Sequence, residues 1–158
     1  MPTIEATSSA AGLRFALVVS KYHEFVTDRL REAALAALDA AGVPAPEVTV
    51  VRVPGAFEIP LAAQTAAETG RFDAIVCLGC VVRGETPHFD YICSAVAHGL
   101  TSGAAATGIP MAFGVLTTNS IEEALARAGE GPANKGREAA LAAIEMAQVV
   151  SVLGRPRP

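Results

Sequence analysis

The sequence has no tryptophan and few other aromatic residues, which make up 5% of its 158 residues. It is also short of charge: Asp, Glu, Lys and Arg together account for 18% of the chain, and the net charge is −4 at pH 7. Proteins that coat nucleic acids or anionic lipid surfaces carry an excess of Lys and Arg. The absence of such an excess excludes both classes, so any anion that the chain binds must be held by a local site.

Cysteine and long apolar runs are scarce as well. The three cysteines cannot all pair, which argues against a disulfide framework. Residues 1–12 lack the basic flank and apolar core of a secretory signal. No stretch approaches the roughly 20 apolar residues that cross a bilayer. Together these absences predict a soluble protein of the reducing cytoplasm, with no membrane partner.

Small apolar residues are abundant by contrast. Hydrophobic residues form 51% of the chain, and a protein of 16.2 kDa buries roughly 68% of its unfolded surface. The sequence therefore predicts one folded domain over residues 1–158, in which residues 1–12 either stay loose or pair with a partner as a strand. Because so few charges cover the outside, part of the apolar surface is expected to pack against other subunits.

Short apolar runs alternate with segments of helical periodicity. Buried strands that alternate with helices form a parallel sheet covered on both faces. We therefore expect an α/β fold, a three-layer αβα sandwich with a four-stranded parallel sheet. Strands are predicted at residues 14–20, 47–53, 73–80 and 111–116, and helices from the first strand up to Gly42 and at 57–69, 86–106, 120–129 and 135–150.

Ligands of such sheets bind beyond the carboxyl ends of the strands. The loop at residues 81–88 is the most informative there. Thr86 is predicted to cap a helix whose first residue is Pro87, and the free amides of that helix start would attract a phosphate. His88 is placed to exchange protons with the molecule that carries the phosphate. The alternative is a well-capped helix with an exposed histidine.

The loops at residues 21–25, 54–58 and 113–119 offer groups for a flat heterocycle. The backbone of the PGAFEIP motif at residues 56–58 is predicted to contact a ring edge, unless this is an ordinary strand-to-helix turn. Tyr22 and Phe113 are predicted to lie at the same edge of the sheet and to stack on the ring, although isolated aromatics more often pack in a core.

Two cations and two cysteines remain to be interpreted. Arg127 and Lys135 flank the sequence GEGP outside the predicted crevice, either as solvated charges or as phosphate ligands for a neighbouring subunit. Cys77 and Cys80 form a C-x-x-C pair, but they close an apolar strand, and Cys93 alone does not supply the second ligand pair of a structural zinc. We therefore expect neither a redox site nor a metal site.

Several spaced motifs, in this order, resemble the 6,7-dimethyl-8-ribityllumazine synthase family. The resemblance implies a flavodoxin-like fold and the condensation of 5-amino-6-(D-ribitylamino)uracil with 3,4-dihydroxy-2-butanone 4-phosphate. That reaction releases phosphate and water and is the penultimate step of riboflavin biosynthesis. It needs no metal or organic cofactor. The matching stretches are PGAFEIP at 54–60, residues 79–91, FGVLTTN at 113–119, ALARAG at 124–129 and NKG at 134–136, within a likeness that runs from about residue 15 to residue 148.

The resemblance also implies roles for single residues. Tyr22 matches the ring-stacking aromatic, His88 the proton-transfer residue and Arg127 the phosphate ligand from a neighbouring subunit. The other matched positions are Ala56, Phe57, Glu58, Cys80, Val81, Val82 and Phe113 for the pyrimidine and its ribityl chain, Glu85 and Thr86 for the phosphate, and Lys135 and Glu138 near the site.

The family resemblance implies a homo-oligomer, either a pentamer or an icosahedral cage of pentamers, with riboflavin synthase as a candidate partner. The turn from Gly129 to Asn134 has no insertion, which favours the cage. It lacks the lysine and second glycine common in cage-forming relatives, and Pro132 stiffens it, so both assemblies stay open.

Three alternatives compete with this hypothesis. An archaeal-type riboflavin synthase is disfavoured by the PHFDY and PGAFEIP stretches. A flavodoxin-like or response-regulator module needs a phosphate loop or acidic pocket directly after the first strand, where this chain has residues 20–23, SKYH. A catalytically silent flavin-binding, lumazine-binding or cage-forming protein of the same fold is disfavoured because Thr86, His88 and Arg127 are all present.

Overall fold

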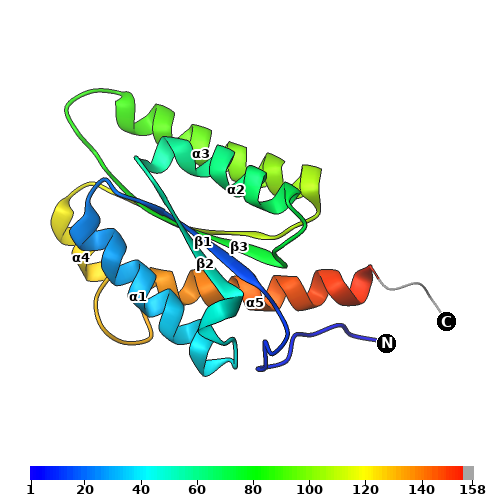
Figure 1. The fold of residues 1–158 in the computed structure, drawn as a ribbon. Helices are drawn as coiled ribbons and strands as arrows, with labels where there is room; N and C mark the ends of the chain where they lie inside the picture. Colours follow the sequence, from blue (N-terminus) through cyan, green and yellow to red (C-terminus); the bar gives the residue numbers. More distant parts are fainter. Residues whose placement is uncertain (155–158) are drawn as a thin grey trace.

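Four parallel strands form the central layer of the protein, whose computed structural model describes residues 1–154 (Figure 1). They are β1 (Phe15–Ser20), β2 (Val48–Val53), β3 (Ala74–Val82) and β4 (Met111–Thr118), in the order β2-β1-β3-β4. β2 and β4 therefore lie at opposite edges of the sheet. The predicted parallel α/β sandwich is confirmed.

Helices cover both faces of the sheet (Figure 1). α2 (Ile59–Glu68) and α3 (His88–Thr107) lie on one face, and α1 (Glu24–Ala40), α4 (Ile121–Arg127) and α5 (Lys135–Leu153) lie on the other. Two short 3₁₀ turns, η1 (Ala45–Glu47) and η2 (Ala56–Glu58), complete the described elements. Every connection between consecutive strands passes through a helix, as parallel pairing requires.

The two central strands explain why the apolar runs are continuous rather than alternating. All residues of β1 are buried, and so are the first eight residues of β3. Alternate side chains enter two separate cores. Leu17 and Val76 pack with α1 and α5, whereas Val18 and Ile75 pack with α2 and α3. Burial on both faces thus accounts for the nearly continuous apolar runs of these strands, in which the buried Ser20 at the end of β1 is a polar exception.

The helix pair α1 and α5 makes a very close contact at Gly136. A Cβ atom built on Gly136 would lie 2.0 Å from the carbonyl oxygen of Leu30 in α1. Asn134, two residues earlier, caps α5: its side-chain oxygen accepts hydrogen bonds from the backbone N–H of Gly136 at 2.8 Å and of Arg137 at 3.3 Å. The sequence NKG therefore has a structural explanation, because the asparagine starts the helix and the glycine lets it approach α1.

Three predicted details at the carboxyl edge are wrong. β3 continues to Val82 and β4 to Thr118, so residues 81–82 and 117–118 belong to strands instead of loops. Residues 113–116, predicted both as strand and as loop, are strand. The ladder between β3 and β4 pairs these residues, which outweighs the expected turn. Thr86 does not cap α3, because Pro87 precedes the first helical residue and its carbonyl accepts hydrogen bonds from Asp90 and Tyr91.

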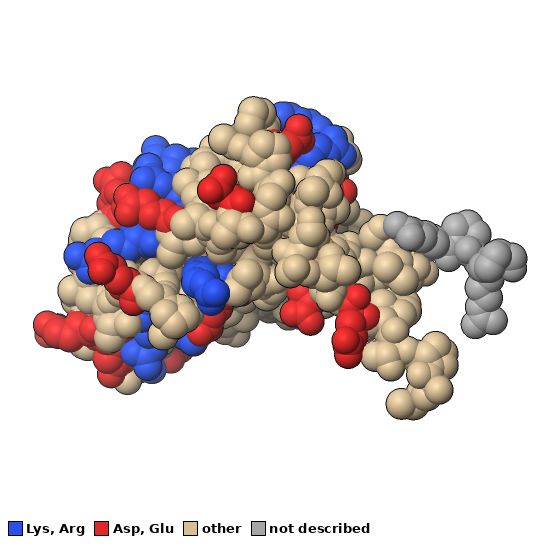
Figure 2. Space-filling model, turned by 90° about the horizontal axis from the view of Figure 1, so that it is seen from below, with Lys and Arg blue, Asp and Glu red and all other residues tan. Residues whose placement is uncertain are grey.

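The surface formed by α1, α4 and α5 carries its charges unevenly. Figure 2 shows Lys, Arg, Asp and Glu gathered over one half of this side of the molecule, whereas the half nearer the C-terminal end is mostly uncharged. From residue 139 to the end of α5, Glu145 is the one charged residue. Leu141, Met146 and Leu153 of α5 are exposed. This end of α5 therefore presents an apolar face.

Candidate active site

Two loops at the carboxyl ends of β1 and β2 are joined by their backbones. The N–H of Lys21 donates to the carbonyl of Val53 at 2.8 Å, and the N–H of Tyr22 donates to the carbonyl of Pro54 at 3.1 Å. Tyr22 and Phe57 are 68% and 62% exposed. Exposed aromatic rings on two loops joined at one edge of the sheet offer surfaces on which a planar heterocycle can stack.

The 3₁₀ turn after β2 offers two free amides instead of the three predicted. The N–H of Glu58 donates to the carbonyl of Gly55 at 3.3 Å, whereas those of Ala56 and Phe57 have no acceptor within the described residues. Ala56 is buried, and Phe57 and Glu58 are exposed. The Ala56 and Phe57 amides and the Glu58 carboxylate therefore remain available to a ligand.

The end of β3 lies between these two loops and the segment that leads to α3. The side chains of Cys80 and Val81 are buried on opposite faces of the sheet, and Val82 is half-buried. Burial raises the pKa of the Cys80 thiol to about 11 and raises the pKa of the Cys77 thiol as well. A thiol whose pKa is raised in this way is a poor nucleophile, which agrees with a packing role for the C-x-x-C pair.

We expect iodoacetamide at pH 8 to leave Cys77 unmodified in the folded protein. The reactive form of cysteine is the thiolate, and Cys77 is fully buried with a raised pKa. Peptide mass spectrometry before and after unfolding in guanidinium provides the measurement, with the partly exposed Cys93 as the internal comparison. Modification of Cys77 as fast in the folded as in the unfolded protein would contradict the buried position in β3.

The segment between β3 and α3 has free backbone donors next to a helix start. Glu85, Thr86 and His88 are exposed, and their backbone amides donate no hydrogen bond within residues 1–154. The start of a helix carries a partial positive charge of about half a unit, and free N–H groups there bind anions. Since its hydroxyl does not cap α3, Thr86 has an additional donor for the same anion.

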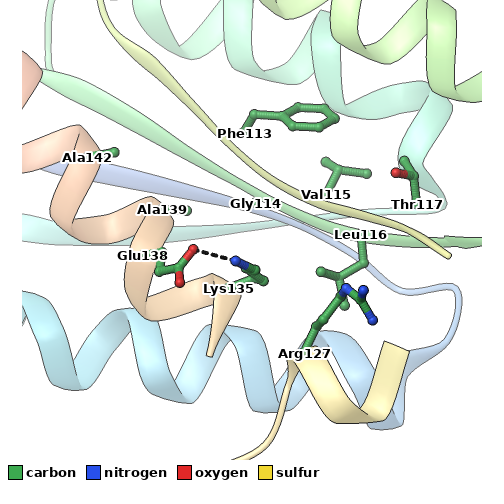
Figure 3. Close-up of a pocket in the computed structure, with 10 residues that line it drawn as sticks. All are labelled: Phe113, Gly114, Val115, Leu116, Thr117, Arg127, Lys135, Glu138, Ala139 and Ala142. Carbon is green, nitrogen blue, oxygen red and sulfur yellow. Dashed lines mark hydrogen bonds and ion pairs between the residues drawn. The ribbon is translucent and has the colours of Figure 1, made fainter. Parts of the chain in front are cut away.

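A second surface lies along the free edge of β4 and has a groove of about 390 Å³. Figure 3 shows Phe113 on one side of β4 and Arg127, Lys135 and Glu138 on the other. The Lys135 ammonium lies 2.8 Å from a Glu138 carboxylate oxygen, and an Arg127 Nη1 donates to the carbonyl of Glu123 at 3.0 Å. Two cations and one carboxylate therefore line an open, half-apolar groove.

The groove and the strand-end loops lie on different parts of the subunit. Arg127 and Lys135 lie outside the crevice formed by these loops, in agreement with the topological prediction. Phe113 also lies outside it, although it was predicted to lie inside. Phe113 pairs with Cys77, whereas β3 continues to Val82. At roughly 3.3 Å per residue, Phe113 is about 16 Å from the carboxyl edge of the sheet. The predicted convergence is corrected at Phe113, which lies in a separate groove, whereas the loop after β4 begins at Asn119.

Sequence reasoning missed Arg83 and Asn119, which follow β3 and β4. The Arg83 Nε donates to the Asn119 side-chain oxygen at 3.0 Å. Arg83 directly precedes the glycine of the segment at residues 84–87, which was the available signal. Asn119 lies 36 residues further along the chain, so that no local pattern could pair the two.

Neither metal ligation nor membrane insertion is visible in the part of the chain that the structure describes. Residues 1–154 contain no group of three or more His, Cys, Asp or Glu side chains arranged to hold a metal ion. Among the same residues, no helix has the length and apolarity to cross a membrane.

Comparisons with known proteins agree with one another. Residues 12–151 match a family model described as 6,7-dimethyl-8-ribityllumazine synthase. A protein of that name from Salinibacter ruber is 53% identical over 154 residues, which cover 97% of this chain and 99% of the relative. Another from Desulfatibacillum aliphaticivorans is 48% identical over 143 residues, or 90% of this chain and 92% of the relative. The similarity thus extends over both surfaces described above.

Proposed function

The chain belongs to the 6,7-dimethyl-8-ribityllumazine synthase family, and from this premise we propose that its active site is completed between two subunits. The enzyme condenses two small molecules, 5-amino-6-(D-ribitylamino)uracil and 3,4-dihydroxy-2-butanone 4-phosphate, into 6,7-dimethyl-8-ribityllumazine in riboflavin biosynthesis. The crevice of one copy and the β4 groove of a second copy would enclose the two reactants.

One observation carries this proposal: the matched residues fall into two groups that a single subunit keeps apart. Tyr22 lies at the carboxyl end of β1, whereas Phe113 lies about 16 Å from that edge on the outermost strand. A substrate of this size does not reach both in one subunit. Each group, however, presents an exposed aromatic and polar groups toward the outside, as two halves of a shared site would.

In the proposed arrangement the pyrimidine stacks on Tyr22. Its ring edge and ribityl chain bind to the amides of Ala56 and Phe57 and to the Glu58 carboxylate. The end of β3, at Cys80, Val81 and Val82, lines the bottom of the site. The backbone of Phe113 from the second copy forms hydrogen bonds with the edge of the uracil ring. Support comes from the exposure of these aromatics and the free amides of the 3₁₀ turn.

The phosphate of the second substrate is assigned to the segment with Glu85 and Thr86. Its free amides and the start of α3 supply a positive partial charge, and Arg127 of the second copy adds a guanidinium that can contact phosphate through two N–H groups. Lys135 and Glu138 lie in the same groove as Arg127, and in the proposed site their ion pair holds the Lys135 ammonium near the bound phosphate.

The chemistry then needs proton transfer more than covalent catalysis. The aryl amine attacks the ketone, a first water leaves as the Schiff base forms, and phosphate is eliminated. The second amine then attacks the remaining carbonyl and closes the ring with loss of a second water. Each step moves a proton, and the exposed imidazole of His88 beside the phosphate segment is assigned that work. Because amine and ketone are intrinsically reactive, much of the acceleration comes from holding the two together.

The reaction is tested by mixing the purified protein with both substrates. We expect lumazine fluorescence and inorganic phosphate to appear in equal amounts, well above the uncatalysed background. When either substrate is omitted, neither lumazine fluorescence nor enzyme-dependent phosphate release should appear. A folded protein that produces no acceleration, and that instead retains a bound flavin or lumazine, would show that this chain keeps the family fold without its activity.

His88→Ala is expected to lower kcat roughly 10- to 100-fold while leaving measurable turnover, because general acid–base catalysis is lost but the positioning of two reactive molecules remains. His98→Ala, an exposed histidine on the same helix, is the matched control and should leave kcat unchanged. Steady-state assays on both variants decide the matter. An unaltered kcat for His88→Ala would remove the histidine from the proton transfers.

The wider assembly is proposed as a homo-oligomer, a pentamer or an icosahedral cage of pentamers, located in the cytoplasm, with riboflavin synthase as a candidate partner. The exposed apolar residues of α5 support subunit packing. Light scattering separates the two assemblies by mass, and a monomer at micromolar concentration would overturn the shared site.

A further inference from the structure

The segment from Gly84 to Pro87 is fixed by its backbone only at its two ends. At one end the N–H of Arg83 donates to the carbonyl of Thr118 at 2.9 Å. At the other end the carbonyl of Pro87 accepts from the N–H of Asp90 at 3.0 Å. The backbone groups of residues 84–86 make no hydrogen bond within the described residues. Backbone pairing alone therefore leaves the position of the first turn of α3, and of His88 on it, weakly determined.

The side chain of Arg83 supplies the missing connection. Its guanidinium carbon lies 4.3 Å from the centre of the Phe89 ring, and one Nη lies 3.5 Å from an Asp90 carboxylate oxygen. On its other side, Nε donates to the side-chain oxygen of Asn119 at 3.0 Å. One side chain thus joins the two residues that follow His88 to the end of β4.

The anchor at Asn119 is itself held in place. The N–H of Asn119 donates to a Glu123 carboxylate oxygen at 2.9 Å, and the N–H of Glu123 donates to the Ser120 hydroxyl at 3.1 Å. The second bond is one half of the capping box predicted for Ser120 and Glu123. In the other half, the Glu123 carboxylate accepts from Asn119, one residue before the N-cap, instead of from Ser120. Phe89 is buried, so its ring is also fixed by the core. Arg83 therefore connects two held points across residues 84–86, whose backbones make no hydrogen bond within the described residues.

The contacts of Arg83 are poorly suited to a purely stabilising role. Its side chain is 46% exposed and that of Asp90 is 62% exposed. Ion pairs this exposed contribute little to the free energy of unfolding. A planar guanidinium, however, fixes geometry, because it can stack on a ring while donating in its own plane. Directional contacts with little stability are what a positioning role requires.

We propose that Arg83 is a positioning residue whose guanidinium holds the first turn of α3 against the end of β4 and thereby places the His88 imidazole for proton transfer. This inference rests on the proposed function, since it assigns Arg83 no contact with substrate and acts only through His88. It assigns a role to a residue that lies within the matched stretch at 79–91 and to which the resemblance gave none.

A double-mutant cycle tests the proposal with Arg83→Gln, His88→Ala and the double variant in the substrate assay. We expect Arg83→Gln to lower kcat about tenfold, because small displacements of a catalytic group are costly. The KM for the pyrimidine should change less than about twofold. In the His88→Ala background the same substitution should change kcat less than about twofold, because coupled residues are not additive.

Arg14→Gln is the matched control. Arg14 is 47% exposed, pairs with Asp73 and lies at the amino end of β1, away from the site. It should leave kcat unchanged. Arg83→Lys keeps the positive charge but lacks the planar guanidinium, and its kcat should lie between those of the unmodified protein and Arg83→Gln. If Arg83→Gln does not fold, Arg83→Lys and Asp90→Asn carry the same cycle, since both preserve size.

The outcomes separate this inference from the function on which it rests. Equal, additive effects of Arg83→Gln in both backgrounds overturn the positioning role while the function of His88 stands. A kcat unchanged by His88→Ala overturns both. A tenfold loss of kcat that vanishes in the His88→Ala background confirms that Arg83 acts through the histidine.

Discussion

Gly136→Ala should greatly lower the free energy of unfolding. The added Cβ would lie 2.0 Å from the Leu30 carbonyl oxygen, and the contacted atoms belong to the backbone of a buried helix, which cannot rotate away. α1 and α5 would have to separate, and such overpacking costs roughly 3–5 kcal/mol. Alanine gains about 1 kcal/mol in helix propensity over glycine, which does not offset the clash. The loss is a large fraction of a typical stability of 5–15 kcal/mol.

Urea unfolding followed by circular dichroism measures this effect. Gly129→Ala is the matched control, because its Cβ would come no closer than 3.7 Å to any neighbour, and its stability should change by less than about 1 kcal/mol. An unchanged unfolding midpoint for Gly136→Ala would mean that the two helices are packed less closely than the structure has them.

Arg127→Ala is expected to raise the KM for the butanone phosphate roughly 10- to 100-fold and to leave the KM for the pyrimidine within about twofold. Hydrogen bonds from a charged donor are worth about 1.5–3 kcal/mol, which corresponds to that range. Arg71→Ala, an exposed arginine before β3 at the opposite end of the sheet, is the control and should change neither KM. An unchanged KM for the phosphate substrate would remove Arg127 from the site.

The same variant tests whether the site is shared. In mixed oligomers of Arg127→Ala and His88→Ala subunits, some sites combine an intact histidine with an intact arginine. Random mixing in a symmetric assembly makes these about a quarter of all sites. Unfolding and refolding the two variants together should therefore raise the activity above that of either variant alone. If each subunit contained its own complete site, mixing would restore nothing.

The fold was predictable because its determinants are local. The apolar runs of β1 and β3 are continuous since helices cover both faces, and Ser120 with Glu123 marks the start of α4 by chemistry alone. The ends of β3 and β4 were missed because they depend on pairing between Val82 and Thr118, which are far apart in the chain. Their β-branched side chains were the remaining local signal.

The sequence proposes residues for the candidate site, and the structure changes how some of them are arranged. The motif around His88 indicates an anion site through its helix start, and the topology separates Arg127 from the crevice. Phe113 was misplaced because its neighbour, Cys77, is determined by strand register. Arg83 was overlooked since an arginine before a glycine has no distinctive pattern until its contacts with Asn119 and Phe89 are known.

The distance between Tyr22 and Phe113 within one subunit also determines how rate depends on protein concentration. If the two halves of each site come from different copies, an isolated subunit turns over no substrate. On dilution toward the subunit dissociation constant, the rate would fall faster than the protein concentration, with a kinetic order in protein above one. Saturating substrate would restore part of that loss, because ligands that bridge two copies favour their association. Specific activity would then report assembly directly.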